Sequence, residues 1–475
     1  MVEIYSDQNQ ELYEDLFKKV EVGDRDGFRE RFLTLHERDQ QELFHLLYPE
    51  KKRKIATFLT PQEFAEVFEW MELEDQEDAV AYLPKDFMVD VFDYLPTDIL
   101  AGFVPVTNEE NIEGILREMD SQEYRSLQEV LSYDVDTAGS IMTKEYFFIS
   151  EELTTQEVIN QIREFGNRAE TIYYLYVVSK NHELVGVLSL RDLLLTPEDT
   201  LVRDAMNHQA VSVRVDEDQE EVAKVIQDYD LIAIPVVTHD QRLVGIITVD
   251  DIMDVIEQER DEDFHEFAGI SASKGEEHRG SSPVNAAKQR APWIIILLFL
   301  SMVSGGLISV FESTLASVVS LAAFIPLIMA AAGNVGTQSL AVSLRNMNDE
   351  DDADKDMKEI LFNEAKTGVL LGFVSGIVVF GIVMVLYRDI VLSLIVGLSI
   401  FLSIIISAVV GTLIPDVIRK LNFDPAVASG PFITTINDTL GLLIYFAIAT
   451  TLISFMLKLV PVSVTLNVVV LELLL

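Results

Sequence analysis

The sequence predicts a multidomain fold with four parts: an all-α helical-repeat domain, a tandem α/β domain pair, an acidic connecting helix and a five-span α-helical transmembrane domain. Three observations predict it. Prolines separate short amphipathic segments in the range 1–130, a strand–turn–strand–helix pattern occurs twice in the range 137–260, and apolar stretches fill residues 291–475. We expect domain boundaries that give residues 1–133, 134–200, 201–249, 250–290 and 291–475.

Charge divides the chain near residue 290. Residues 1–290 carry 64 acidic and 27 basic side chains, whereas residues 291–475 carry 14 and 8. Phosphate binding needs Lys and Arg, so this balance argues against a nucleic-acid partner. The chain has no cysteine, which excludes thiolate metal sites. Carboxylate oxygens suit a hard cation such as Mg²⁺, although most of them are expected on a solvated surface.

The N-terminal part of the chain, in the range 1–130, is expected to form short helices. Apolar residues recur at helical spacing, and prolines punctuate them at Pro49, Pro61, Pro84 and Pro96. Short helices stacked in pairs would form a small helical solenoid. Such a unit typically binds or regulates and does not catalyse.

Residues 137–260 change from helical periodicity to buried strands. The runs "TIYYLYVVS" and "LIAIPVVT" are rich in β-branched and aromatic residues, and each is followed by a turn, a second strand and a helix. The two copies align at a constant offset, which pairs Gly186 with Gly245, Ser189 with Thr248, and Asp192 with Asp251.

This repeated Gly-x-x-Ser/Thr-x-x-Asp pattern resembles a tandem pair of cystathionine-β-synthase-type (CBS) domains. Such pairs are regulatory sensors, often of adenine nucleotides such as ATP. The resemblance implies that Ser189, Asp192 and Thr248 hold a ribose. An equally weighted interpretation is that these residues cap the helices that follow them.

An acidic helix is expected next. The segment "DDIMDVIEQERDEDFHE" (residues 250–266) continues the last helix of the duplicated unit. Like charges one turn apart repel, so this helix costs free energy unless something neutralises it. A Gly/Ser/Lys-rich linker then leads to the membrane.

Five apolar segments are each close to the length of about 20 residues that crosses a bilayer. They cover residues 292–313, 317–345, 364–388, 390–418 and 430–458. Lys and Arg gather before the first span and after the second and fourth. This distribution predicts a multi-pass protein of the cell membrane whose N-terminal domains are cytoplasmic.

One carboxylate, Asp438, lies inside the last span. Thr434 and Gly430 precede it at intervals of one helical turn, and Gly441 follows, so its helix face is small and polar. An ionisable residue within a membrane is by default a functional candidate, and a cation pathway is the function that a carboxylate favours. The alternative is a protonated Asp438 that hydrogen-bonds a neighbouring helix.

A second polar stretch, "AAAGNVGTQSL", places Asn334 and Gln338 on one helix face. Close packing of small residues explains this stretch equally well. The only Lys or Arg in the span of Asp438 is Lys458 at its far end, which argues against an anion path.

The order of these parts resembles the MgtE-type magnesium channels over essentially the whole chain to about residue 458. The segments "GNVGTQS" and "DPAVASGPFITTINDTLGLLIY" resemble that family's membrane signatures. The resemblance implies a homodimer with a central pore, in which Asp438 and its dimer mate hold a hydrated Mg²⁺. Asn334, Gln338, Thr434 and Gly430 would line the pore.

The resemblance also implies that the acidic helix is a plug, which closes the pore when Mg²⁺ bridges it to the preceding domains. The implied metal ligands are Asp251, Asp254, Glu259, Glu262 and Asp263 of that helix, Asp218, Glu220 and Asp230 of the second CBS unit, Asp424 at the membrane, and Asp98 of the helical domain.

The alternative function is a nucleotide-sensing, CBS-regulated secondary transporter of another divalent cation. Lys and Arg occur only near the ends of the spans and His in none of them, so coupling residues are lacking in the span interiors, which weakens this alternative. An enzyme is not expected, because the sequence has no P-loop, HExxH or GxSxG motif.

Overall fold

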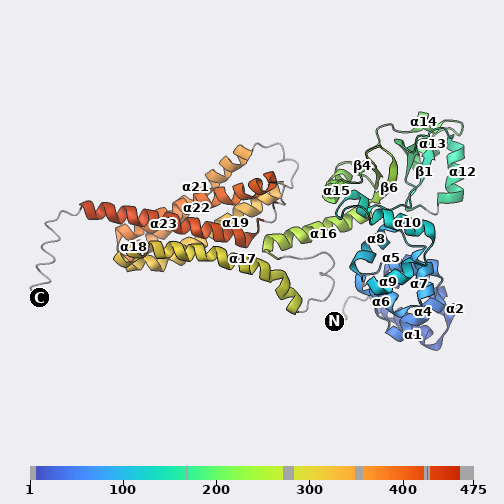
Figure 1. The fold of residues 1–475 in the computed structure, drawn as a ribbon, viewed down its shortest axis with the longest axis horizontal. Coiled ribbons are helices and arrows are strands. Elements are labelled where there is room, and N and C mark those ends of the chain that lie inside the picture. Colours follow the sequence, from blue (N-terminus) through green and yellow to red (C-terminus); the bar gives the residue numbers. More distant parts are fainter. Residues whose placement is uncertain are drawn as a thin grey trace, which may run out of the picture. The chain divides into compact units, whose positions relative to one another are not determined.

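The computed structural model describes residues 7–107, 109–166, 169–270, 283–347, 357–421, 425 and 428–459. The chain divides into two compact units, Met1–Glu259 and Arg260–Leu475, and each is described by itself (Figure 1).

Short helices build the first part of the first unit, as the proline spacing predicts. Pro49 and Pro61 are the first residues of their helices, and Thr60 forms a capping box with Glu63. The elements are α1 (Asp7–Val22), α2 (Arg25–Phe32), α3 (Glu37–His45), α4 (Pro49–Phe58), α5 (Pro61–Glu69), α6 (Leu73–Tyr82), α7 (Lys85–Phe92), α8 (Thr97–Phe103), the 3₁₀ turn η1 (Val104–Val106), α9 (Glu109–Leu116) and α10 (Ser121–Val130).

A buried ion pair lies inside this helical part. Lys52 Nζ is 3.4 Å from Asp75 Oδ1 and 2.7 Å from Asp78 Oδ2, and the side chains of Lys52 and Asp75 are each 3% exposed. His45 Nδ1 lies 2.9 Å from the same Asp75 carboxylate. Because the two charges are almost out of water, each depends on the other for its stabilisation.

The duplicated unit forms two three-stranded sheets, in the orders β1-β2-β3 and β4-β5-β6. In each sheet the first two strands are parallel and the last two antiparallel. The strands are β1 (Phe148–Ser150), β2 (Tyr174–Val178), β3 (Leu184–Ser189), β4 (Val213–Arg214), β5 (Ala233–Val237) and β6 (Leu243–Thr248). The accompanying helices are α11 (Ala138–Ile141), α12 (Thr155–Phe165), α13 (Leu190–Leu195), α14 (Val202–Ala205) and α15 (Gln219–Asp228). The predicted strand–turn–strand–helix pattern is confirmed in both copies.

The two copies exchange the segments that lead into them. The Asn207 and Val187 backbones exchange hydrogen bonds of 2.8 and 3.0 Å, so the residues before β4 pair with β3 of the first copy. Likewise Thr143, which precedes β1, pairs with Ile246 of β6 at 2.8 and 3.1 Å. Gly186 admits this approach, because a Cβ there would lie 2.7 Å from Met206 Sδ.

The predicted acidic helix is one continuous helix, α16 (Val249–Ala268). It ends at Gly269, whose positive φ of 70° is the left-handed conformation that commonly terminates helices.

The second unit contains the expected apolar helices. Within the described residues, five helices are long and apolar enough to cross a membrane, as predicted. The elements are α17 (Pro283–Val310), α18 (Glu312–Ser317), the 3₁₀ segment η3 (Val319–Phe324), α19 (Ile325–Met347), α21 (Met357–Tyr387), α22 (Ile390–Lys420) and α23 (Gly430–Leu459). Figure 1 shows the long helices of this unit running alongside one another.

Candidate functional site

Asp438 on α23 faces α19. A Cβ placed on Gly333 of α19 would lie 3.1 Å from Asp438 Oδ1 and 2.7 Å from Thr434 Cγ2. Asp438 Oδ1 is buried and has no hydrogen-bond partner among the described residues. A buried oxygen without a donor is costly, so this position favours a cation, a proton or a water molecule beside it.

The four residues expected to line a pore do not form one surface within a single chain. Thr434 packs against α19, with its Oγ1 3.0 Å from Thr337 Oγ1, and Gly430 is buried. Asn334 and Gln338 share one face of α19, as predicted, and that face is at least partly exposed. Two of the four residues therefore contact a neighbouring helix, and the other two are open to a partner, to lipid or to water.

Asn437 is a polar residue that the sequence analysis did not single out. Its side chain is fully buried, and neither amide atom has a hydrogen-bond partner in the described part of the chain. A Cβ on Gly336 would overlap its Nδ2, so Gly336 makes room for the amide. Its place beside Asp438 in an apolar span was the available signal.

The end of α16 lies at the start of α23. Phe267 packs onto a small apolar cluster that contains Ala428 and Ile433, and a Cβ on Gly269 would lie 3.6 Å from Pro431 Cγ. A groove of about 550 Å³ is open beside this contact, lined by residues of α16, α17, α19 and α23 that include Gly430 and Thr434. Asp424, expected as a metal ligand here, lies outside the described residues.

The first unit gathers carboxylates around the beginning of α16. Asp98, in the first turn of α8, has a buried Oδ1 without a hydrogen-bond partner among the described residues. Burial and the nearby charge of Asp251 raise the pKa of Asp98 to about 8. Asp251 accepts a hydrogen bond from the Thr248 hydroxyl, and burial raises its pKa to about 6. The structure thus brings together two of the predicted ligands.

Two further carboxylates belong to this group, although no sequence motif marks them. Burial, with the charges of Glu170 and Asp98, raises the pKa of Glu69 to about 8. Burial, with the charges of Asp251 and Asp250, raises the pKa of Glu170 to about 7. We call Glu69, Asp98, Glu170 and Asp251 the acidic cluster.

The acidic cluster is not a closed metal cage. Among the described residues, no three Asp, Glu or His side chains lie close enough together to hold a metal ion directly. Mg²⁺ gives up its waters reluctantly and often binds through them. The wider spacing is therefore compatible with a hydrated ion and not with a fully dehydrated one.

Two more predicted ligands, Asp218 and Glu220, flank Gln219 at the start of α15, and Gln219 contacts a third, Glu259. Gln219 Nε2 donates a 2.5 Å hydrogen bond to Glu259 of α16. Asp218 caps α15 by accepting a 2.9 Å bond from the Glu220 backbone, and the Glu220 carboxylate lies 3.3 Å from Lys224 Nζ.

The remaining predicted ligands are more exposed. Asp230 is exposed, with a positive φ of 50°. Asp254 and Asp263 lie on the exposed side of α16, and Glu262 is partly buried. Burial and the charge of Glu257 raise the pKa of Asp254. The structure does not bring these four residues into one group.

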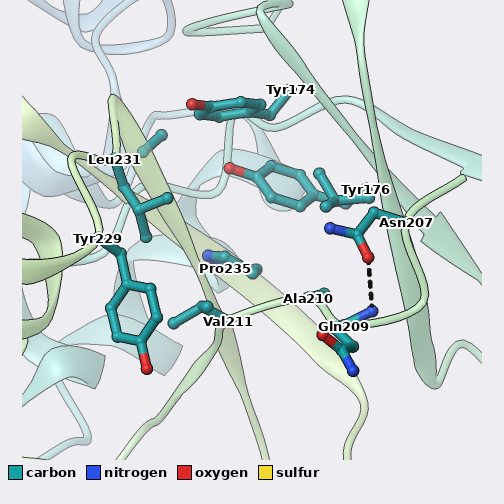
Figure 2. Close-up of a pocket in the computed structure, with 11 residues that line it drawn as sticks. Tyr174, Tyr176, Asn207, Gln209, Ala210, Val211, Tyr229, Leu231 and Pro235 are labelled. Atoms are coloured by element: carbon teal, nitrogen blue, oxygen red, sulfur yellow. Dashed lines mark hydrogen bonds between the residues drawn. The ribbon is translucent and has the colours of Figure 1, made fainter. Parts of the chain in front are cut away.

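Of the residues expected to hold a ribose, Ser189 caps the helix that follows it, and Thr248 bonds the carboxylate of Asp251. Ser189 Oγ accepts a 3.0 Å bond from the Asp192 backbone and donates a 2.7 Å bond to its carboxylate. The Thr248 hydroxyl and backbone both donate to the Asp251 carboxylate. A cavity of about 540 Å³ lies elsewhere in the pair, lined by Tyr174, Tyr176 and Tyr229 among other residues (Figure 2). The three expected ribose ligands are not among its lining residues.

These features define a class of protein: a multi-pass membrane protein with a carboxylate in its last span and a soluble acidic unit that carries a CBS pair. Family models agree with it. The MgtE divalent cation transporter model matches residues 325–448. The MgtE intracellular N domain model matches residues 35–136, and the CBS domain model matches residues 138–198 and 202–258.

Relatives identify the family. The chain is 42% identical over 329 residues to the magnesium transporter MgtE of Enterococcus faecalis, covering 69% of this chain and 72% of that protein. The crystal structure of the soluble part of a magnesium transporter matches with 35% identity and a TM-score of 0.52, covering 53% of this chain and 99% of that one. The cytosolic domain of the Mg²⁺ channel MgtE in complex with ATP matches with 35% identity and a TM-score of 0.48, covering 51% and 99%.

The chain belongs to the MgtE family. It is a multi-pass membrane protein whose N-terminal domains are cytoplasmic. The curated relatives are named as magnesium transporters, so the alternative of a secondary transporter for another divalent cation is not favoured.

Proposed function

We propose that this chain moves Mg²⁺ into the cell through a pore at Asp438, and that cytosolic Mg²⁺ closes the pore by binding to the carboxylates of the first unit. The observation that carries the proposal is the contrast between the two groups of acids. One carboxylate stands in an apolar span, and a cluster of buried carboxylates with raised pKa values surrounds the start of α16.

Asp438 supplies the charge that an ion needs inside the bilayer. In a homodimer the two Asp438 side chains would present a charge of −2 to a divalent cation. Carboxylate oxygens can bind the first water shell of Mg²⁺ without removing it, which keeps the ion mobile. Asn334 and Gln338, at least partly exposed on α19, would supply polar contacts along the path.

The acidic cluster supplies the sensor. Its members raise one another's pKa, so closing them around α16 without a cation costs free energy. A hydrated Mg²⁺ offsets that cost. A site with a millimolar Kd stabilises the closed arrangement by only about 0.4 kcal/mol when the ion concentration equals Kd. Several sites filling together would therefore give a graded response to cellular Mg²⁺.

Helix α16 connects sensor to pore. Asp251 belongs to its first turn, and Phe267 near its end packs beside Ala428, just before α23 begins. Asp438 lies two turns further along α23. A cation that fixes α16 at its acidic end would thereby hold its apolar end at the entrance of the last span, which is the action of a plug.

The other assignments remain proposals of the same kind. They comprise the five domain boundaries, a homodimer, the absence of enzymatic activity, pore-lining roles for Thr434 and Gly430, and Mg²⁺ ligands at Asp254, Glu259, Glu262, Asp263, Asp218, Glu220, Asp230 and Asp424. We also propose that an adenine nucleotide such as ATP binds the CBS pair, in the cavity where tyrosine rings offer stacking surfaces.

The test is Mg²⁺ current in inside-out patches while cytoplasmic Mg²⁺ is stepped from micromolar to about 10 mM, a range that brackets a millimolar Kd. Wild type should conduct and close as Mg²⁺ rises. Asp438→Asn should lower conduction by about tenfold or more, since losing about 1.4 kcal/mol of ion stabilisation has that effect. Glu312→Gln removes an exposed carboxylate of the same unit and is the control. Full conduction by Asp438→Asn would refute the pore assignment, and current that ignores cytoplasmic Mg²⁺ would refute the sensor.

A further inference from the structure

The CBS pair has an internal two-fold repeat, so a feature of one half has a counterpart in the other. Asn207 pairs with Val187 of β3, and Thr143 pairs with Ile246 of β6 in the same way. Val187 and Ile246 occupy equivalent positions in the two copies, at the constant offset seen in the sequence. Asn207 and Thr143 are therefore equivalent as well, and the residues that follow them can be compared one by one.

The cavity of about 540 Å³ in Figure 2 belongs to one side of this repeat, and we call it the first cleft. Gln209, two residues after Asn207, lines it together with Tyr176 and Tyr229. The Tyr176 hydroxyl is buried and has no hydrogen-bond partner among the described residues. None of the described residues that line the first cleft is charged. Aromatic faces, amides and an unpartnered hydroxyl suit the base and sugar of a nucleoside.

The other side of the repeat has carboxylates in place of neutral side chains. Glu145 lies two residues after Thr143 and so corresponds to Gln209. Glu170 corresponds to Tyr229 at the constant offset, and its backbone donates a 2.6 Å hydrogen bond to the Glu145 carbonyl. We call Thr143, Glu145 and Glu170 the counterpart site. Its two carboxylates repel the phosphates of a nucleotide, so this site lacks the neutral chemistry of the first cleft.

The first turn of α8 occupies the counterpart site. The Thr97 backbone and hydroxyl donate hydrogen bonds of 3.1 and 2.9 Å to the two carboxylate oxygens of Glu145. The Thr143 hydroxyl and the Lys144 backbone donate bonds of 2.6 and 3.0 Å to the same carboxylate. Thr97 is 3% exposed, and hydrogen bonds to an ionised acceptor are stronger than bonds between neutral groups. The Glu145 carboxylate therefore joins the helical domain directly to the CBS pair.

We propose that α8 is an internal ligand of the CBS pair, held at the counterpart site by Glu145, and that a nucleotide is confined to the first cleft. The exchange of Gln209 for Glu145 between the two halves sets this difference. The docking of α8 depends on contacts within the first unit and not on transport, whereas the nucleotide at the first cleft rests on the proposed function. Glu145 thereby helps to keep Asp98, the residue after Thr97, near Asp251.

A distance within the full-length protein tests the docking. The chain has no cysteine, so Glu50→Cys in the helical domain and Asp199→Cys in the CBS pair, both at exposed positions, can carry two spin labels. The labelled protein is kept in detergent and diluted with unlabelled protein, so that pulsed EPR reports distances within one chain. The measurement is repeated from micromolar to about 10 mM Mg²⁺, a range that brackets a millimolar Kd.

Glu145→Gln should raise the ratio of released to docked chains about tenfold at each Mg²⁺ concentration, which corresponds to losing about 1.4 kcal/mol. The reason is that its amide presents a donor to Thr97 where the carboxylate presents an acceptor. Thr97→Val, which keeps the backbone bond, should have a smaller effect in the same direction. Equal distance distributions for wild type and Glu145→Gln at every Mg²⁺ concentration would overturn the docking. A wild-type distance that ignores Mg²⁺ would refute the proposed sensor instead.

The matched exchange at the equivalent position tests the confinement of the nucleotide. Equilibrium dialysis counts the ATP bound to the same proteins, and wild type should bind one ATP per chain. Gln209→Glu places a carboxylate in the first cleft, so it should weaken ATP binding about tenfold or more, equivalent to about 1.4 kcal/mol, and leave the distance unchanged. Glu145→Gln should still bind one ATP per chain, which also shows that its CBS pair is folded.

Two outcomes of the dialysis would overturn the confinement: two ATP per wild-type chain, or a Gln209→Glu protein that binds ATP as tightly as wild type. Absence of ATP binding in every protein would refute nucleotide binding, which belongs to the proposed function, and the EPR distances would still decide whether Glu145 holds α8.

Discussion

The acidic cluster makes a prediction about stability that can be worked from one side chain, Glu69. Burial and neighbouring carboxylates raise its pKa from 4.5 to about 8. In the unfolded chain the carboxyl is ionised above pH 4.5, whereas in the folded protein it must take up a proton or bear repulsion. The folded state therefore loses stability as the pH rises from about 4.5 to about 8.

The size of the effect follows from the shift. A pH of 7 is about 2.5 units above the ordinary pKa of this carboxyl, 4.5, and each unit corresponds to about 1.4 kcal/mol, which gives an upper limit of about 3.5 kcal/mol. Water and relaxing neighbours reduce such values, so we expect that Glu69→Gln stabilises the protein by about 1–2 kcal/mol at pH 7. The gain should vanish near pH 4.5.

The assay is urea unfolding of a fragment of residues 1–270 at pH 5 and pH 7.5, with and without Mg²⁺. A corresponding soluble part of a magnesium transporter has been crystallised. With a Kd of about 1 mM, about 10 mM Mg²⁺ should stabilise the wild type by about 1.4 kcal/mol, and Glu69→Gln should gain less. Glu74→Gln, an exposed carboxylate nearby, is the control. A Glu69→Gln protein that is no more stable than wild type at pH 7.5, or that gains as much from Mg²⁺, would refute the reasoning.

Three further predictions concern packing and capping. Gly336→Ala should lower the free energy of unfolding by about 1–3 kcal/mol, because the new Cβ would overlap the buried Asn437 amide. Thermal unfolding in detergent measures this loss, and the control is Gly306→Ala, where no atom lies within 4 Å of the new Cβ. Equal melting temperatures of the two variants would contradict the prediction. Lys52→Met should lower the free energy of unfolding by about 3 kcal/mol, because it leaves Asp75 buried without its cation. Urea unfolding measures the loss, with Lys18→Met as the matched control. A difference between the two variants below about 1 kcal/mol would speak against a buried ion pair. Thr248→Val should destabilise the first unit by about 1 kcal/mol, because Asp251 loses the hydroxyl bond at the start of α16; Thr248→Ser, which keeps the hydroxyl, should recover most of it.

Periodicity and length were sufficient to predict the main architecture. The order of helical domain, duplicated unit, acidic helix and five spans depends on patterns that are local in the sequence, each contained within a single element or a pair of elements. The strands β1 and β4 were missed because they contain three and two residues, too few for alternation to appear. Their positions depend on pairing with β2 and β5 instead.

The candidate site was only partly predictable, for a related reason. Asp438 was recognisable because one charge in an apolar span is conspicuous by itself. Glu69 and Glu170 look like ordinary surface acids in the sequence, and only the tertiary fold places them beside Asp98 and Asp251. Thr434 was expected to line a pore, yet its hydroxyl lies against Thr337 in a single chain, a contact that helix periodicity does not specify.

The exchanged segments of the CBS pair have a consequence for how the pair can be divided. The repeat in the sequence suggests two interchangeable cassettes that meet near residue 200. The hydrogen bonds between Asn207 and Val187, and between Thr143 and Ile246, cross that line in both directions. A fragment that ends at residue 200 would lack Asn207, so one edge of β3 would lose its backbone partner. A fragment that begins there would lack Thr143, so β6 would lose its partner in the same way. The unit that can be transplanted, permuted or expressed is therefore the whole pair, and a ligand that loosens one half also loosens the edge strand of the other.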